Sequence, residues 1–137
     1  MRLALVALFA ATFVLGACQP TQTGVEAASV FCGDLRALNR SVAALNVTSG
    51  AATVGEFQQR MKAVEDTWAD LKESAKVVPD ARVNDLETAY NDLKQTVGSL
   101  PSDSSLAEAT QTVQPKAAAV GRARQQLGSG VRCPGQQ

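Results

Sequence analysis

The stretch TVGEFQQRMKAVEDTWADLKESA, Thr53 to Ala75, decides the fold. Its apolar residues recur alternately three and four positions apart, at Val54, Phe57, Met61, Val64, Trp68, Leu71 and Ala75. This spacing forms one apolar stripe on an α-helix and leaves charged residues on the opposite face. The stretch therefore predicts an amphipathic helix that packs against other helices.

Three further segments show the same pattern. The first has Ala28, Phe31, Leu35, Leu38, Val42 and Leu45; the next has Val83, Leu86, Tyr90, Leu93, Val97 and Leu100; the last has Leu106, Ala109, Val113, Ala117, Val120 and Leu127. No segment sustains a period of two, so the class is all-α. Short connections between four helices predict an antiparallel up-down four-helix bundle, although the same spacing also permits a coiled coil between chains.

Capping signals support these helices. Three pairs have the spacing of a capping box, in which a hydroxyl and a carboxylate three residues later satisfy each other's backbone amides: Thr23 with Glu26, Thr53 with Glu56, and Ser105 with Glu108. Asp80, which follows Pro79, is a candidate N-cap for the third helix. We therefore expect helix starts near these four positions.

The fourth helix contains a proline. Pro115 removes one backbone hydrogen bond and clashes with the preceding turn, at about 3 kcal/mol, so the helix should kink or divide, and we favour a kink. Gly128-Ser129-Gly130 then supplies a C-cap. The bundle is expected to span residues 25–127, followed by a C-terminal tail, residues 128–137, that carries Cys133.

The first residues have the build of an export signal. Arg2 provides a positive charge, Leu3 to Val14 is an unbroken apolar run, and Leu15-Gly16-Ala17-Cys18 follows. The run is shorter than the roughly 20 apolar residues that span a bilayer as a helix. LGAC resembles the lipobox of bacterial lipoproteins, in which an aliphatic residue and two small residues precede a cysteine. The alternative is an ordinary cleaved signal peptide with a chance cysteine.

The resemblance covers only residues 1–18. It implies that residues 1–17 are a lipoprotein signal peptide, that Cys18 carries the lipid, and that the mature protein is anchored to a membrane in the extracytoplasmic cell envelope. Gln19 in place of Asp would favour outer-membrane sorting if the cell is Gram-negative. Residues 18–24 form a tether that spans roughly 20 Å at most, so the domain should lie close to the membrane.

With Cys18 assigned to lipid, Cys32 and Cys133 are left as a pair in an oxidising compartment. Cys32 lies early in the first helix and Cys133 lies just beyond the fourth. An up-down bundle brings these two positions to the same end. We therefore expect one disulfide that joins Cys32 to Cys133 and closes a loop of about 100 residues.

The composition excludes several function classes. The chain has no histidine, which removes the commonest general base and the commonest transition-metal ligand. Its 13 basic and 13 acidic residues give no basic excess that would indicate nucleic acid or an anionic membrane surface as a partner. We expect no enzyme activity, no nucleic-acid binding and no cofactor.

Two residue groups have both a functional and a structural interpretation. Glu65, Asp66, Asp70 and Glu73 form the densest acidic group, but the backbone spacing of a calcium loop is missing, so we favour a solvated helix face and expect no metal. Phe57, Met61 and Trp68 are able to line a pocket for an apolar ligand, but they occupy stripe positions, which favours core packing.

Together these features predict a lipid-anchored, monomeric bundle that acts as a structural or protein-interaction module on an unknown envelope partner. The alternative is a carrier that binds a small apolar ligand in the bundle core near Met61, Trp68 and Pro115. The short tether would leave the sides of the bundle and the loops Asn46 to Ala52 and Pro101 to Ser104 for contacts.

Overall fold

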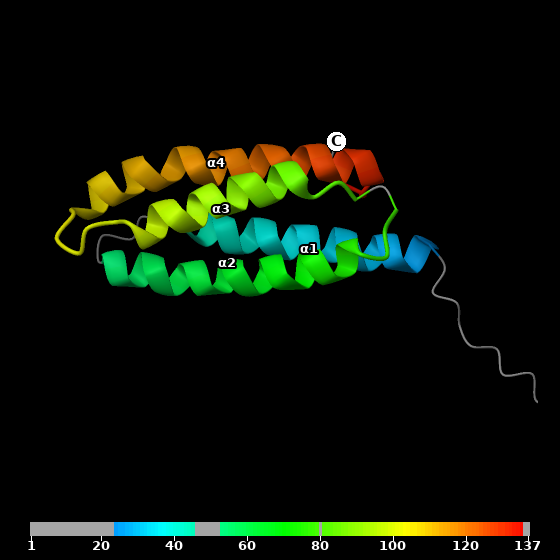
Figure 1. The fold of residues 1–137 in the computed structure, drawn as a ribbon, viewed down its shortest axis with the longest axis horizontal. Helices are drawn as coiled ribbons and strands as arrows, with labels where there is room; N and C mark the ends of the chain where they lie inside the picture. The colour runs from blue at the N-terminus through cyan, green and yellow to red at the C-terminus, as the bar shows by residue number, and fades with distance from the viewer. Residues whose placement is uncertain (1–23, 46–52, 80, 136–137) are drawn as a thin grey trace, which may run out of the picture.

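The computed structural model describes residues 24–45, 53–79 and 81–135. In these residues the chain forms four helices and no strand: α1 (Gly24–Leu45), α2 (Val54–Ala75), α3 (Asn84–Gly98) and α4 (Leu106–Val131). Successive helices lie side by side and run in opposite directions (Figure 1). α1 packs chiefly on α2, α3 packs chiefly on α4, and contacts of α1 with α4 and of α2 with α3 close the bundle. The predicted all-α four-helix bundle is confirmed.

All four helices contribute to one apolar core. Its largest fully buried side chains are Phe31, Phe57, Leu35, Leu38, Leu45, Leu71, Leu86, Leu93, Val64, Val97, Val113 and Val120. Each of them belongs to a predicted stripe. The three-four spacing keeps these residues on one face of their helix, and burying each large apolar side chain there stabilises the fold by roughly 1.5 to 3 kcal/mol.

The stripes differ from the prediction at two helix ends. Ala27 and Ser74 are buried where we expected Ala28 and Ala75, both of which are partly exposed. Each shift moves the stripe by one residue, which the spacing of three or four residues allows at the end of a helix. The Ser74 hydroxyl donates a hydrogen bond to the Leu71 carbonyl at 3.1 Å, so burial leaves this polar group satisfied.

Two of the predicted capping boxes are confirmed. The Thr53 hydroxyl accepts from the Glu56 amide at 3.3 Å, and the Glu56 carboxylate accepts from the Thr53 amide at 2.6 Å. Ser105 and Glu108 make the same pair of bonds at the start of α4. Thr23 lies outside the described residues, as does the loop Asn46 to Ala52.

The predicted N-cap of the third helix is wrong. α3 begins at Asn84, and its N-cap is Val83, whose side chain makes no capping hydrogen bond. Residues before it are held by turns, in which Val78 donates to the Ala75 carbonyl at 3.2 Å and Ala81 donates to the Val78 carbonyl at 3.1 Å. These turns delay the helix by several residues beyond Asp80, which itself lies outside the described residues.

The predicted end of the fourth helix is also wrong. α4 is one helix that continues through Pro115, so the helix does not divide there. Pro115 is exposed, on the side of α4 away from the core. The helix passes Leu127 and ends at Val131, because the residue that stops it is Arg132 in the left-handed conformation and not the glycines at 128 and 130. The bundle therefore extends beyond residue 127.

Candidate functional site

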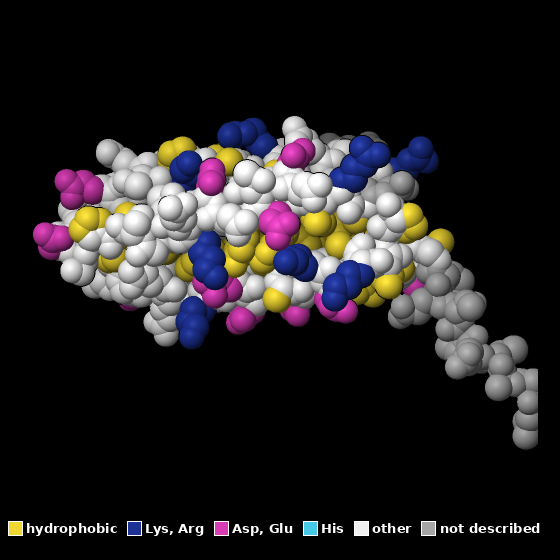
Figure 2. All heavy atoms as spheres, viewed as in Figure 1, with side chains coloured by type: hydrophobic (Ala, Val, Ile, Leu, Met, Phe, Trp, Pro, Cys, Tyr) yellow, Lys and Arg dark blue, Asp and Glu magenta, His cyan; other side chains and the backbone are white. Residues whose placement is uncertain are grey.

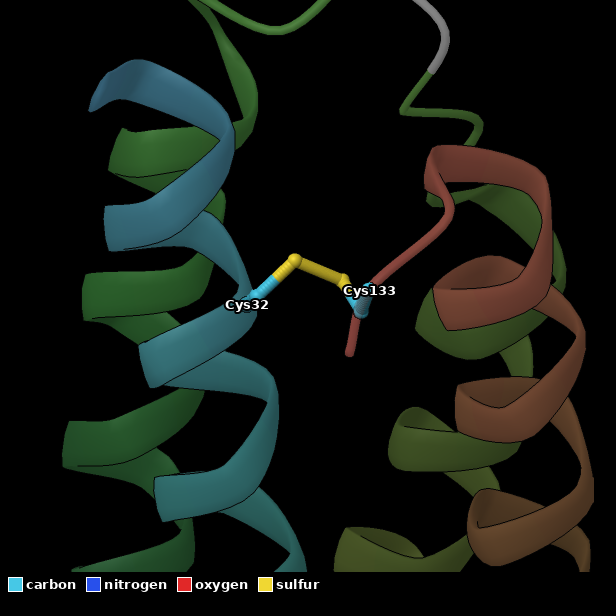
Figure 3. The surroundings of a disulfide bond; sticks show 2 residues. All are labelled: Cys32 and Cys133. Carbon is cyan, nitrogen blue, oxygen red and sulfur yellow. A yellow bond between two sulfur atoms is a disulfide. The ribbon is translucent and has the colours of Figure 1, made fainter. Parts of the chain in front are cut away.

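The disulfide joins the two ends of the described chain. Cys32 in α1 and Cys133 just after α4 are bonded, with their Cα atoms 5.5 Å apart, and each is 5% exposed. Figure 3 shows the bond crossing the space between α1 and the segment that leaves α4. The bond lies at the end of the bundle that also holds the start of α1, the end of α2 and the start of α3 (Figure 1). The predicted Cys32–Cys133 pair is confirmed.

A local motif at the end of α4 brings Cys133 to α1. Arg132 has φ 62° and ψ 43°, a left-handed conformation that reverses the chain direction. The Cys133 amide donates to the Gly128 carbonyl at 2.8 Å, and the Arg132 amide donates to the Ser129 carbonyl at 3.2 Å. These two bonds form a Schellman motif and satisfy carbonyls that a helix end leaves open.

Two hollows flank α1 at the disulfide end. We call the first the cationic groove. It lies between α1 and α4 and is lined by Arg36, Arg124 and Arg132 with Gly24, Val25, Ala28, Ser29, Cys32, Asn39, Gln125, Gln126, Ser129, Val131, Pro134 and Gly135. None of the described residues that line it carries a carboxylate. Burial lowers the pKa of Arg124 below its ordinary value, but that value is so high that the guanidinium stays charged at neutral pH.

We call the second the acidic hollow, which lies between α1 and the end of α2. It is lined by Ala27, Val30, Asp34, Asp70, Glu73, Ser74 and Val77, so in the described part of the chain no basic side chain lines it. Val30 and Val77 are 53% and 59% exposed, so two large apolar side chains border the carboxylates. The Lys76 ammonium binds the Glu73 carboxylate from outside the hollow. The opposite charges of the two hollows make the two sides of α1 chemically different.

Aromatic stacking and ion pairs hold α2 against α3. The rings of Trp68 and Tyr90 stack with centroids 4.9 Å apart and an interplanar angle of 21°. On one side Lys94 binds Glu65, and on the other Lys72 binds Glu87, each at 3.3 Å. Burial and then the nearby Glu65 carboxylate raise the pKa of Tyr90 above its ordinary value of 10.0. This side of the bundle has compensated charges.

The predicted acidic group on α2 is divided by the structure. Glu65 pairs with Lys94, Glu73 pairs with Lys76, and Asp70 lines the acidic hollow. In the described part of the chain no three cysteine, aspartate or glutamate side chains are grouped so as to hold a metal ion. The group is therefore a helix surface from which two residues, Asp70 and Glu73, face the acidic hollow.

The residues considered for an apolar ligand do not come together. Phe57, Met61 and Trp68 are 2%, 3% and 5% exposed and belong to the core cluster. Pro115 is exposed on the outside of α4. Pro115 therefore does not lie in the core with Met61 and Trp68, as the hypothesis of one ligand site formed by these three residues requires.

Sequence reasoning missed the cationic groove. Its signal is present in the sequence, since Glu108 is the last acidic residue and is followed by Lys116, Arg122, Arg124 and Arg132. The overall charge balance conceals this segregation. Figure 2 shows acidic side chains at the tip where α3 leads into α4, and basic side chains near the C-terminal end of α4.

Cys18, the predicted lipidation site, lies outside the described residues. None of the helices within residues 24–45, 53–79 and 81–135 is both long enough and apolar enough to cross a membrane. Comparison of the chain with protein families, with curated proteins and with solved structures finds no match to any of them. The proposals below therefore rest on the residues and their geometry.

Proposed function

We propose that this chain is a lipid-anchored protein of the cell envelope that binds another envelope protein through its helical surface. In this proposal Cys18 carries the lipid and the disulfide-closed bundle is the binding module. The protein needs no catalytic residue or cofactor for this role.

Two features support the location. LGAC at residues 15–18 resembles a lipobox, and the Cys32–Cys133 disulfide is compatible with an oxidising, extracytoplasmic compartment. α1 begins at Gly24, so the tether from Cys18 to Thr23 has six residues, five of which separate Cys18 from the first helix. At a maximum of roughly 20 Å this tether would keep the disulfide end of the bundle near the lipid.

The observation that carries the binding role is the acidic hollow. In the seam between α2 and α3, Glu65 and Glu87 are each paired with a lysine. In the acidic hollow, Asp34, Asp70 and Glu73 lie beside two exposed valines, and none of the described residues that line it is basic. Apolar residues bordered by charges of one sign are typical of a surface that recognises a partner. A partner segment that carries lysine or arginine beside apolar residues would match it.

Photo-crosslinking in intact cells tests this role. A photoreactive amino acid at position 30 or 77 should capture a specific protein, and the matched probe at Gln58, on the exposed face of α2, should not. Changing Asp34→Asn and Asp70→Asn together should abolish the capture at position 30 because the charge complementarity is lost. Equal capture from Gln58, or capture that the double variant leaves unchanged, would contradict the proposed site.

A further inference from the structure

Two of the arginines that line the cationic groove, Arg36 and Arg132, form no ion pair with any described residue. The segment from residue 109 to residue 135 has four basic residues and no acidic residue. Lys116 binds Asp92 of α3 at 3.5 Å, whereas Arg36 and Arg132 form no ion pair within residues 24–45, 53–79 and 81–135. The seam between α2 and α3 is the opposite case, since two lysines there are matched by two glutamates. The side formed by α1 and α4 therefore carries arginines whose charge the described carboxylates do not match.

The groove also offers apolar contact. Val25 is 79% exposed, and Val131 and Pro134 line the groove beside it. A surface that combines arginines with exposed aliphatic side chains matches the interface of a lipid bilayer. There the guanidinium groups bind phosphates and the aliphatic groups enter the headgroup layer.

The groove lies where the chain would meet a membrane. Gly24, the first residue of α1, lines it. A tether of six residues reaches roughly 20 Å at most, which is shorter than the roughly 40 Å length of α4. The side of the bundle between α1 and α4 can therefore reach the bilayer while Cys18 stays anchored in it.

We propose that the cationic groove binds the phosphates of anionic lipid headgroups and holds the bundle on its side against the bilayer, with α1 and α4 facing the lipid. The proposal depends on the proposed function in one respect only, the lipid anchor on Cys18. The groove itself is open to a test without any lipid on the protein.

Nucleic acid fits the groove less well. Among the described residues that line it none is aromatic, so they offer no stacking platform of the kind that single-stranded nucleic acids use. An acidic protein segment is the other possible ligand, and the experiment must separate it from lipid.

The test uses the mature chain, residues 18–137, with Cys18→Ser, since all the described core residues lie between Ala27 and Cys133. Vesicles made of equal parts phosphatidylglycerol and phosphatidylcholine are compared with vesicles of phosphatidylcholine alone in a sedimentation assay. The groove variant combines Arg36→Gln with Arg132→Asn, because asparagine tolerates the left-handed conformation at position 132. The matched control combines Lys62→Gln with Arg82→Gln, two exposed cations outside the groove.

We expect the parent chain to bind the anionic vesicles only, and increasingly weakly as salt is added. The groove variant should lose about 25-fold in its partition coefficient, because each basic residue near an anionic surface contributes about five-fold. The control pair should lose less than about two-fold. Thermal unfolding followed by circular dichroism verifies that both variants fold.

Trp68 provides an internal reporter of orientation, since it is the one tryptophan of the chain and lies in the seam between α2 and α3. Docking through α1 and α4 should leave its fluorescence unquenched by brominated lipids in the bound state. Equal losses in the groove and control variants, binding to neutral vesicles, or strong quenching of Trp68 would each overturn the proposal. The proposal would also be overturned if the parent chain did not bind the vesicles but bound a polyglutamate peptide, and if the groove variant lost that peptide binding.

Discussion

Removing the disulfide should cost this bundle a large part of its stability. The bond connects residues 101 positions apart, so it closes nearly the whole described chain into one loop. In the chain-entropy treatment a loop of that length lowers the entropy of the unfolded state enough to stabilise the fold by about 4.7 kcal/mol. Typical domains have a total stability of only about 5 to 15 kcal/mol. The reduced bundle should therefore be marginal.

The perturbation is best made in two ways on the mature chain with Cys18→Ser. The first is reduction of the disulfide, and the second is the double variant Cys32→Ala and Cys133→Ala. Alanine is preferred to serine because both positions are buried, and an unpaired hydroxyl there would add a desolvation cost of about 1 to 3 kcal/mol. Urea unfolding followed by circular dichroism gives the free energy of unfolding in each case.

In both forms the free energy of unfolding should be about 4 to 5 kcal/mol lower than in the oxidised chain. If the free energy of unfolding that remains is close to zero, the helix content without urea should also fall. A loss below about 1 kcal/mol in both forms would refute the reasoning, because the closed loop would then contribute no restraint on the unfolded chain. Free thiols titrated in the denatured, unreduced chain should be absent, and finding two would refute the disulfide itself.

Three further predictions concern the anchor and two ionisable groups. Cys18→Ser should abolish incorporation of a palmitate analogue in cells, while the Cys32→Ala and Cys133→Ala chain keeps the label; a labelled Cys18→Ser chain would exclude the lipoprotein assignment. Bonds from the Ser105 amide and hydroxyl lower the pKa of Glu108, so this cap stabilises the fold at neutral pH and stops doing so as the pH falls through that lowered value. Ser105→Ala should therefore reduce the urea midpoint at pH 7 and reduce it less in acid, and an equal reduction at both pH values would count against the carboxylate's part. Since the pKa of Tyr90 is raised in the folded chain, the unfolded chain loses the phenol proton at a lower pH. The parent should therefore lose stability above about pH 10, and the Tyr90→Phe variant should lose less. Parallel losses of stability in the two chains at alkaline pH would argue against the shift.

The parts of the fold that the sequence predicts are the local ones. The stripe from Val54 to Leu71 and the capping boxes at Thr53 and Ser105 depend on residues three or four positions apart, which meet in any helix. The pairing of Cys32 with Cys133 followed from the assignment of Cys18 to lipid, and an even number of antiparallel helices agreed with it because it returns the two termini to one end.

The two wrong boundaries have different causes. Asp80 has a suitable side chain for a cap, but successive turns from Ala75 to Ala81 occupy the backbone before α3. Gly128 has the flexibility of a cap, yet α4 continues past it, and its carbonyl accepts from Cys133. The position at which Cys133 must reach α1 is a property of the assembled bundle, and no short sequence pattern encodes it.

The candidate surfaces were hidden for a different reason. Net charge sums all residues, so a chain with equal numbers of acidic and basic residues gives no hint that they are separated in space. On α1, residues five positions apart such as Val25 and Val30 point to different neighbours, one toward the cationic groove and one toward the acidic hollow. Predicting such surfaces requires knowing which helix lies on each side of α1.

The two proposals assign different roles to the sides of one bundle. If α1 and α4 lie on the lipid, the seam between α2 and α3 is turned away from the membrane, and there the stacked Trp68 and Tyr90 are bordered by paired charges. The acidic hollow would then lie at the edge of the membrane contact, with carboxylates that anionic headgroups repel. Lipid and partner would therefore occupy different sides of α1 without competition. Loss of vesicle binding in the groove variant should accordingly leave crosslinking from position 30 in place.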